Sequence, residues 1–122
     1  MKKEWFKEYS ECLNRDMEFM VYGHAGQPIL VFPSQDGRYF DFENNGMVHT
    51  VEHLIDQGRI QLFCCDSIDP ESWSGKGLDP RHRTYMMEQW YYYVVNELVP
   101  RIFEINSYGN GGGYADGIFT TG

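Results

Sequence analysis

A short apolar run, I-L-V-F at residues 29–32, constrains the fold more than any other stretch of the chain. No polar residue interrupts it, and a strand without polar alternation is covered on both faces of its sheet. Pro33 then ends the strand because it lacks an N–H, and the polar residues 34–37 form a turn. We therefore expect a central strand of an α/β sheet, in which ligands bind at the carboxyl ends of the strands.

Composition limits the class of protein and of partner. With 122 residues, 42% of them hydrophobic, the chain fits one domain with a core of its own. A net charge of −8 disfavours nucleic acid and anionic membranes as partners, which leaves a neutral or small partner. The three cysteines are odd in number and the start has no apolar signal core, so we expect a cytoplasmic protein with reduced thiols. No apolar run approaches the roughly 20 residues that span a bilayer, so no membrane anchor is expected.

Periodicity predicts the elements on either side of the central strand. Residues 5–9 and 17–22 alternate weakly and are interpreted as an antiparallel hairpin. Residues 47–57 have helical spacing and Gly58 is placed to end that helix. Residues 60–65 are nearly all apolar and predict a second central strand. A strand, a helix and a strand in one sheet imply a parallel pair with a right-handed crossover. The apolar stripe of the helix consists of Val48, Val51, Leu54 and Ile55.

The second half of the chain predicts a loop, a long helix and a last strand. Residues 68–80 are rich in Pro and Gly and are interpreted as a loop, and residues 81–105 as a helix with Asp79 as N-cap. Pro100 predicts a kink, because it cannot donate to Asn96. Residues 117–122 predict a third strand of the central type. The buried stripe of the helix consists of Met86, Trp90, Val94, Leu98 and Ile102.

These elements predict an α/β three-layer sandwich with a mixed, mostly parallel sheet and an antiparallel hairpin at its start. We expect no metal and no cofactor. His49 and His53 match H-x-x-E-H, a zinc pattern, but the apolar stripe turns both toward the polar side. Cys64 and Cys65 are adjacent on a strand and point to opposite faces, so they cannot share an ion. The glycine-rich residues 109–113 lack the Lys-Ser/Thr of a phosphate-binding loop.

Polar residues at two strand ends are the best candidates for a ligand site. Asp66 and Ser67 follow one buried strand, and Ser34, Gln35 and Asp36 follow the other. On one rim of the sheet these residues can line a pocket. The alternative is that they are turn residues that end the strands. No serine has a base in an evident relation to it, so no nucleophile is assigned.

Four short motifs follow one another along the chain. They are V-F-P-S-Q-D-G-R at 31–38, F-C-C-D-S at 63–67, E-S-W at 71–73 and E-L-V-P-R-I at 97–102. Over essentially its whole length the chain resembles the amino-terminal half of bacterial esterases of the α/β-hydrolase fold. The resemblance implies a single partial α/β-hydrolase domain, residues 1–122, that ends just before the nucleophile elbow.

The resemblance also implies roles for individual residues. Gly122 corresponds to the first glycine of the G-x-S-x-G elbow, so the serine, the acid and the histidine lie beyond it. The backbone N–H groups of Ser34 or Gln35 correspond to the oxyanion loop. The implied pocket rim consists of Asp36, Asp66, Ser67 and Trp73.

Three functions follow as hypotheses. The first is a part of a carboxylesterase-type serine hydrolase for a small-molecule ester, inactive alone because it lacks the catalytic triad. Such a chain is expected to associate with itself or with the missing half through its exposed last strand. The second is a non-catalytic binding or interaction module. The third is a zinc enzyme that uses His49 and His53.

Overall fold

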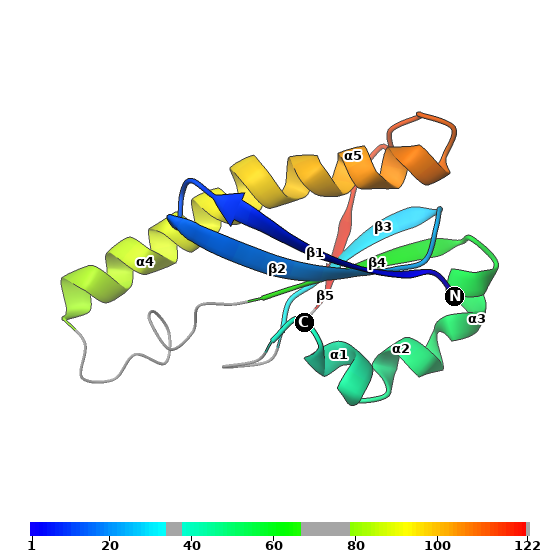
Figure 1. The fold of residues 1–122 in the computed structure, drawn as a ribbon, viewed down its shortest axis with the longest axis horizontal. Helices are drawn as coiled ribbons and strands as arrows, with labels where there is room; N and C mark the ends of the chain where they lie inside the picture. Colours follow the sequence, from blue (N-terminus) through cyan, green and yellow to red (C-terminus); the bar gives the residue numbers. More distant parts are fainter. Residues whose placement is uncertain (34–37, 67–78, 122) are drawn as a thin grey trace.

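The structure is a computed structural model that describes residues 1–33, 38–66 and 79–121. Its strands are β1 (Lys3–Ser10), β2 (Arg15–Tyr22), β3 (Gln27–Val31), β4 (Ile60–Cys65) and β5 (Phe119–Thr121). Its helices are α1 (Asp41–Asn44), α2 (Met47–Thr50), α3 (Glu52–Asp56), α4 (Pro80–Tyr93), the π-helical segment η2 (Val94–Leu98) and α5 (Val99–Gly109). Helices α1, α2 and α3 lie on one side of the sheet, and α4 and α5 lie on the other (Figure 1).

The sheet is mixed and has the strand order β1-β2-β4-β3-β5. Strand β2 is antiparallel to both of its neighbours, whereas β4, β3 and β5 run parallel. The N-terminal hairpin pairs Lys3 with Tyr22 and Ser10 with Arg15, and Phe6 stacks on Phe19 across it at 5.0 Å between ring centroids. The predicted three-layer α/β fold with an antiparallel hairpin is thus confirmed.

Both predicted central strands occupy the middle of the sheet. Strand β4 lies between β2 and β3 and is buried from Gln61 to Cys65. Successive side chains of a strand point to opposite faces, so Cys64 and Cys65 belong to different cores, as expected. A strand that is apolar on both faces needs helices on both sides, and the two helical layers supply them.

Two apolar cores result, one on each face of the sheet. The core beneath α4, η2 and α5 holds Leu13, Met17, Phe19, Val21, Leu30, Phe63, Cys65, Met86, Tyr93, Val94, Leu98, Ile102 and Ile105. The core beneath α1, α2 and α3 is smaller and holds Tyr22, Val31, Val48, Ile55, Leu62 and Cys64. The stripe predicted for the long helix, from Met86 to Ile102, is confirmed as part of the larger core, with Trp90 as its one partly buried member.

No helix in the described ranges is long and apolar enough to cross a bilayer.

The long helical stretch begins as predicted and changes character near the proline. The side chain of Asp79 accepts a hydrogen bond from the backbone N–H of Arg81 at 2.9 Å, and Pro80 occupies the first turn. Before Pro100 the backbone N–H of Val99 bonds to the carbonyl of Val94, five residues earlier, in a π-helical turn. Such turns bend helices, and this one stands where the missing donor of Pro100 was expected to cause a kink.

Two predictions need correction. The helix expected over residues 47–57 is two short helices separated at Val51, whose φ of −107° and ψ of 10° leave the helical range. Gly58 does follow it with a left-handed φ of +72°, as a helix stop should. Strand β5 was expected to be of the central type, but among the described strands it pairs with β3 alone and lies at the edge. Its Phe119 side chain is 66% exposed.

Candidate functional site

A cavity of about 260 Å³ opens where three parallel strands end. Val31 of β3, Cys64 of β4 and Thr121 of β5 form its strand side, and Phe42 and Met47 belong to the helical side. The other described residues that line it are Phe32, Pro33, Arg38, Tyr39, Asp41 and Asn45. The carboxyl end of a parallel sheet is where α/β proteins bind ligands, so this cavity is the candidate site.

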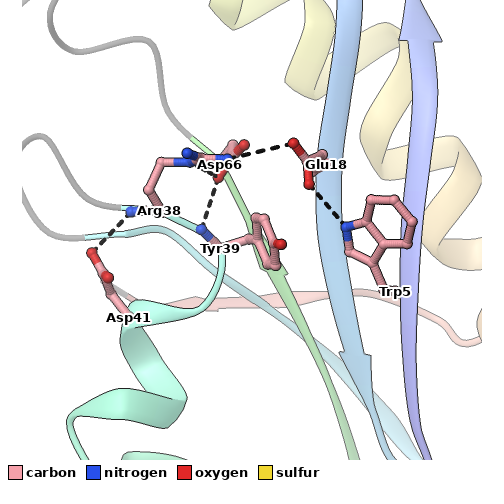
Figure 2. Close-up of polar contacts among 6 residues, drawn as sticks. All are labelled: Trp5, Glu18, Arg38, Tyr39, Asp41 and Asp66. Atoms are coloured by element: carbon pink, nitrogen blue, oxygen red, sulfur yellow. Dashed lines mark hydrogen bonds and ion pairs between the residues drawn. The ribbon is translucent and has the colours of Figure 1, made fainter.

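The segment that follows β3 is held in place on both sides of residues 34–37. Before them, the backbone N–H of Phe32 donates to the carbonyl of Thr121 at 2.8 Å. After them, Nε of Arg38 and the backbone N–H of Tyr39 both donate to Oδ1 of Asp66, at 3.0 and 2.8 Å. The backbone N–H of Arg38 donates to Oδ2 of Asp41 at 2.8 Å. Figure 2 shows the contacts of Arg38 with Asp66 and Asp41 and of Tyr39 with Asp66. With the bond from Phe32 to Thr121, they hold the described residues on either side of 34–37 against the ends of β4 and β5.

A second carboxylate supports the same arginine from β2. Nη2 of Arg38 lies 3.4 Å from Oε1 of Glu18, whose other oxygen accepts a hydrogen bond of 2.9 Å from Nε1 of Trp5 (Figure 2). The guanidinium also lies over the ring of Tyr39, 5.6 Å from its centroid. The hydrogen bond to Asp66 raises the pKa of Arg38, which favours the charged form of the guanidinium.

Most of the site residues predicted from the sequence lie outside the described residues: Ser34, Gln35, Asp36, Ser67, Trp73 and Gly122. Asp66 is described and is 8% exposed. It is not among the described residues that line the cavity, but it holds Arg38 and Tyr39, which are.

Sequence reasoning missed the three residues that join the loop to the cavity wall, Arg38, Tyr39 and Asp41. A signal was present, because an acidic side chain at a helix start can reach back to the backbone N–H three residues before it, as in a capping box. The pairing of Arg38 with Asp66 had no such signal, since 28 positions separate the two.

Cys64 is the thiol at the strand side of the cavity. Burial raises its pKa to about 12, and the nearby charge of Glu43 adds to the effect. The nucleophilic form of a cysteine is the thiolate, which is therefore scarce at neutral pH. In the structure Cys64 packs in the core beneath α1, α2 and α3.

Histidines do not contribute to the cavity. His24, His49, His53 and His82 are all exposed, and none is among the described residues that line it. His49 and His53 belong to different short helices, and Nδ1 of His49 lies 3.1 Å from Oε2 of Glu52. In the part of the chain that the structure describes, no three His, Cys, Asp or Glu side chains converge as a metal site requires.

The buried thiol of Cys64 makes the free energy of unfolding depend on pH in the alkaline range. The folded-state pKa of Cys64, about 12, lies above its ordinary value of 9.0, so the unfolded chain loses this proton first. Its contribution to stability is complete below pH 9.0 and declines as the pH rises toward 12, by about 1.4 kcal/mol per pH unit once the unfolded thiol is ionised. Urea unfolding of wild type and Cys64→Ala from pH 8 to about pH 10.5 tests this. The decline should be shallower in the variant, and parallel curves would contradict it.

Three solved structures are similar to this chain. They are an S-formylglutathione hydrolase from Agrobacterium tumefaciens (19% identity, TM-score 0.60), an uncharacterised protein from Capnocytophaga ochracea (15%, 0.57) and an IroE-like serine hydrolase from Shewanella oneidensis (12%, 0.53). The matches cover 97%, 98% and 83% of this chain. No protein-family model and no curated protein matches the sequence.

The chain spans less than half the length of these structures, at 48%, 32% and 38%. At such identities the likeness concerns the fold. Two of the three similar proteins are hydrolases, and one of these is described as a serine hydrolase. The resemblance to esterases of the α/β-hydrolase fold, indicated by the sequence motifs, is thus confirmed at the level of the fold.

Proposed function

We propose that the chain is the amino-terminal part of a serine ester hydrolase, in which it supplies the oxyanion loop and one side of the substrate pocket. The observation that carries this proposal is the cavity at the ends of β3, β4 and β5, beside the segment that follows β3. In α/β-hydrolases this segment provides one N–H of the oxyanion hole, and the nucleophile stands on the turn after a strand of the same sheet.

The position of β5 supports this assignment. Thr121, its last residue, lines the cavity, and its carbonyl accepts the N–H of Phe32. A polypeptide that continued through Gly122 as G-x-S-x-G would therefore start its turn at the cavity, next to Phe32. The anchoring of Arg38 and Tyr39 by Asp66 suits an oxyanion hole, whose donors must be held in position before reaction.

The proposed reaction requires a serine nucleophile and a histidine base, and neither is among the described residues that line the cavity. The serine oxygen would attack the ester carbonyl carbon while a histidine takes the serine proton, and the negative charge would develop on the carbonyl oxygen, facing the loop N–H groups. The bond to the alcohol oxygen then breaks, the histidine returns the proton to that oxygen, and water releases the acid by the same route. Since no histidine lines the described cavity and Cys64 is neutral, the 122 residues alone are expected to be inactive.

Hydrolysis of 4-nitrophenyl butyrate tests the proposal. The 122-residue chain and a longer chain, extended by whatever its gene encodes after Gly122, are assayed together with a fluorophosphonate that labels nucleophilic serines. We expect hydrolysis and labelling with the longer chain only, on a serine beyond Gly122. Hydrolysis by the 122 residues alone, or none by the longer chain, would overturn the proposal.

A second candidate, an interaction module, is favoured by the exposed edge of β5. Unpaired N–H and C=O groups at a sheet edge pair readily with another chain, and native proteins usually cover or charge such edges. Here the edge carries Phe119 and two threonines, Thr120 and Thr121, and no charge. Among the described strands β5 pairs on one side only, and we propose that two copies pair through its other side. The three free cysteines suit a reducing compartment, and we propose the cytoplasm.

Replacing Phe119 with lysine is expected to prevent this pairing, because a charge on the edge would be desolvated in the dimer. Sedimentation velocity at increasing concentration should give a concentration-dependent dimer for the wild type and a monomer for Phe119→Lys. Tyr114→Lys is the matched control, since Tyr114 is as exposed (67%) but lies outside β5. A wild-type chain that stays monomeric throughout would count against pairing through β5.

A further inference from the structure

We propose that the cavity selects esters with an uncharged acyl group and rejects anionic ones. This inference rests on the proposed function, because it concerns the same site, and it names the class of substrate. It is carried by two observations on the described wall: an apolar strand side, and a set of charges in which carboxylates outnumber cations.

Most of the wall formed by strand ends and helices is apolar, with Thr121 of β5 and Asp41 of α1 as the polar exceptions. Val31, Phe32 and Cys64 contribute from the strand ends, and Phe42 and Met47 from the helices. Cys64 is in its neutral form, because burial raises its pKa to about 12. A short hydrocarbon chain would lose its contact with water there, and each buried methylene contributes about 0.8 kcal/mol.

The charged groups at the cavity favour a neutral ligand over an anion. Arg38 and Asp41 both line it. Arg38 is the one cation among the described lining residues, and it is already shared by Asp66, at 3.0 Å, and Glu18, at 3.4 Å. Two carboxylates therefore share one guanidinium, and Asp41 adds a further negative charge to the lining. An incoming carboxylate would have to compete with Asp66 and Glu18 for Arg38.

Neighbouring charges do not reverse this balance. Lys3 of β1 is paired with Glu43 of α1 at 2.7 Å, so these two charges cancel. The remaining polar lining side chains, Asn45 and Thr121, are neutral, and so is Tyr39, whose pKa is raised by burial. The described charges around the cavity are thus net negative. Over the short distances of a small site, this repulsion is expected to lower the affinity for an anion about tenfold relative to a neutral ligand of the same size.

Binding of two matched amides tests the inference on the 122-residue chain itself. Butyramide and succinamate share the same amide and carbon chain, but a methyl group in the first is a carboxylate in the second. Backbone amide resonances of Tyr39, Cys64 and Thr121 are followed by NMR during titration at constant ionic strength. We expect saturable shifts with butyramide and an affinity about tenfold lower for succinamate.

Removing one negative charge near Arg38 should reduce the difference in affinity between butyramide and succinamate. Glu18→Gln removes one carboxylate from Arg38 and is expected to strengthen succinamate binding several-fold without changing that of butyramide. Glu88→Gln, on the exposed surface of α4 on the other side of the sheet, changes the net charge equally and is the matched control. Added NaCl should likewise strengthen succinamate binding to the wild type and leave butyramide binding unchanged.

Equal affinities for the two amides, or tighter binding of succinamate, would overturn the inference. The absence of saturable shifts with butyramide at these three residues would overturn it as well, because the cavity would then not take an acyl group. These outcomes are separate from failure of the proposed function. A longer chain without esterase activity, combined with the expected preference for butyramide, would remove the hydrolase proposal and leave the selectivity of the cavity standing.

Discussion

Gly109→Ala is expected to destabilise the chain by about 3 kcal/mol or more, about 10 °C in Tm. Gly109 ends α5, and a Cβ there would lie 1.5 Å from the carbonyl oxygen of His24 and 3.2 Å from Cα of Ala25. Both neighbours are backbone, so the helix end and the loop before β3 would have to move apart.

That movement would also break a buried hydrogen-bond network. Nδ2 of Asn106 donates to the carbonyl of Gly26 at 2.9 Å and to Oε1 of Gln61 at 2.8 Å, and Oδ1 of Asn110 accepts from the N–H of Gly26 at 3.2 Å. Asn106 is fully buried, so an amide left without partners there carries the whole cost of its desolvation.

Thermal unfolding followed by circular dichroism measures the effect. Gly113→Ala is the matched control, because the nearest atom to a Cβ at Gly113 is the carbonyl oxygen of Asn110, at an ordinary contact distance of 3.5 Å. We expect the control to unfold within about 2 °C of the wild type, since surface substitutions change stability by about 0.5 kcal/mol or less. A Gly109→Ala protein as stable as the control would show that α5 does not approach the loop this closely.

Asp66→Ala is expected to lower the free energy of unfolding by about 2–3 kcal/mol. Its Oδ1 atom accepts from Nε of Arg38 and from the backbone N–H of Tyr39, and both donors lose their partner. The same loss frees the segment after β3 from the end of β4. Butyramide binding at the cavity, and ester hydrolysis by the longer chain, should therefore fall by about tenfold or more, as removal of an oxyanion donor typically costs more than that.

Two further variants distinguish the effect of losing the hydrogen bonds of Asp66 from the effect of losing its negative charge. Asp66→Asn keeps an oxygen that can accept from Tyr39 and should recover part of the stability. Asp116→Ala removes an exposed carboxylate and should leave stability and binding unchanged. Urea unfolding together with the amide titration covers both effects. Wild-type binding in Asp66→Ala would mean that the carboxylate of Asp66 does not hold the cavity wall.

The candidate site could be predicted only in part from the sequence. The apolar strands before Pro33 and Asp66 predicted a ligand site at their carboxyl ends, because strand burial and strand ends are local features. The cavity does lie there. The roles of Ser34, Gln35 and the other residues outside the described ranges stay predictions.

Local sequence by itself determined the hairpin, both central strands, the capped start of α4 and its buried stripe. Each depends on side-chain period or on a cap within a few residues. Only the tertiary structure decided that β5 lies at the edge, that the helix over residues 47–57 breaks at Val51, and that Arg38 is shared between Asp66 and Glu18. These features come from residues far apart in the chain, whose meeting depends on how the whole sheet and its two helical layers pack, and no short-range pattern records that packing.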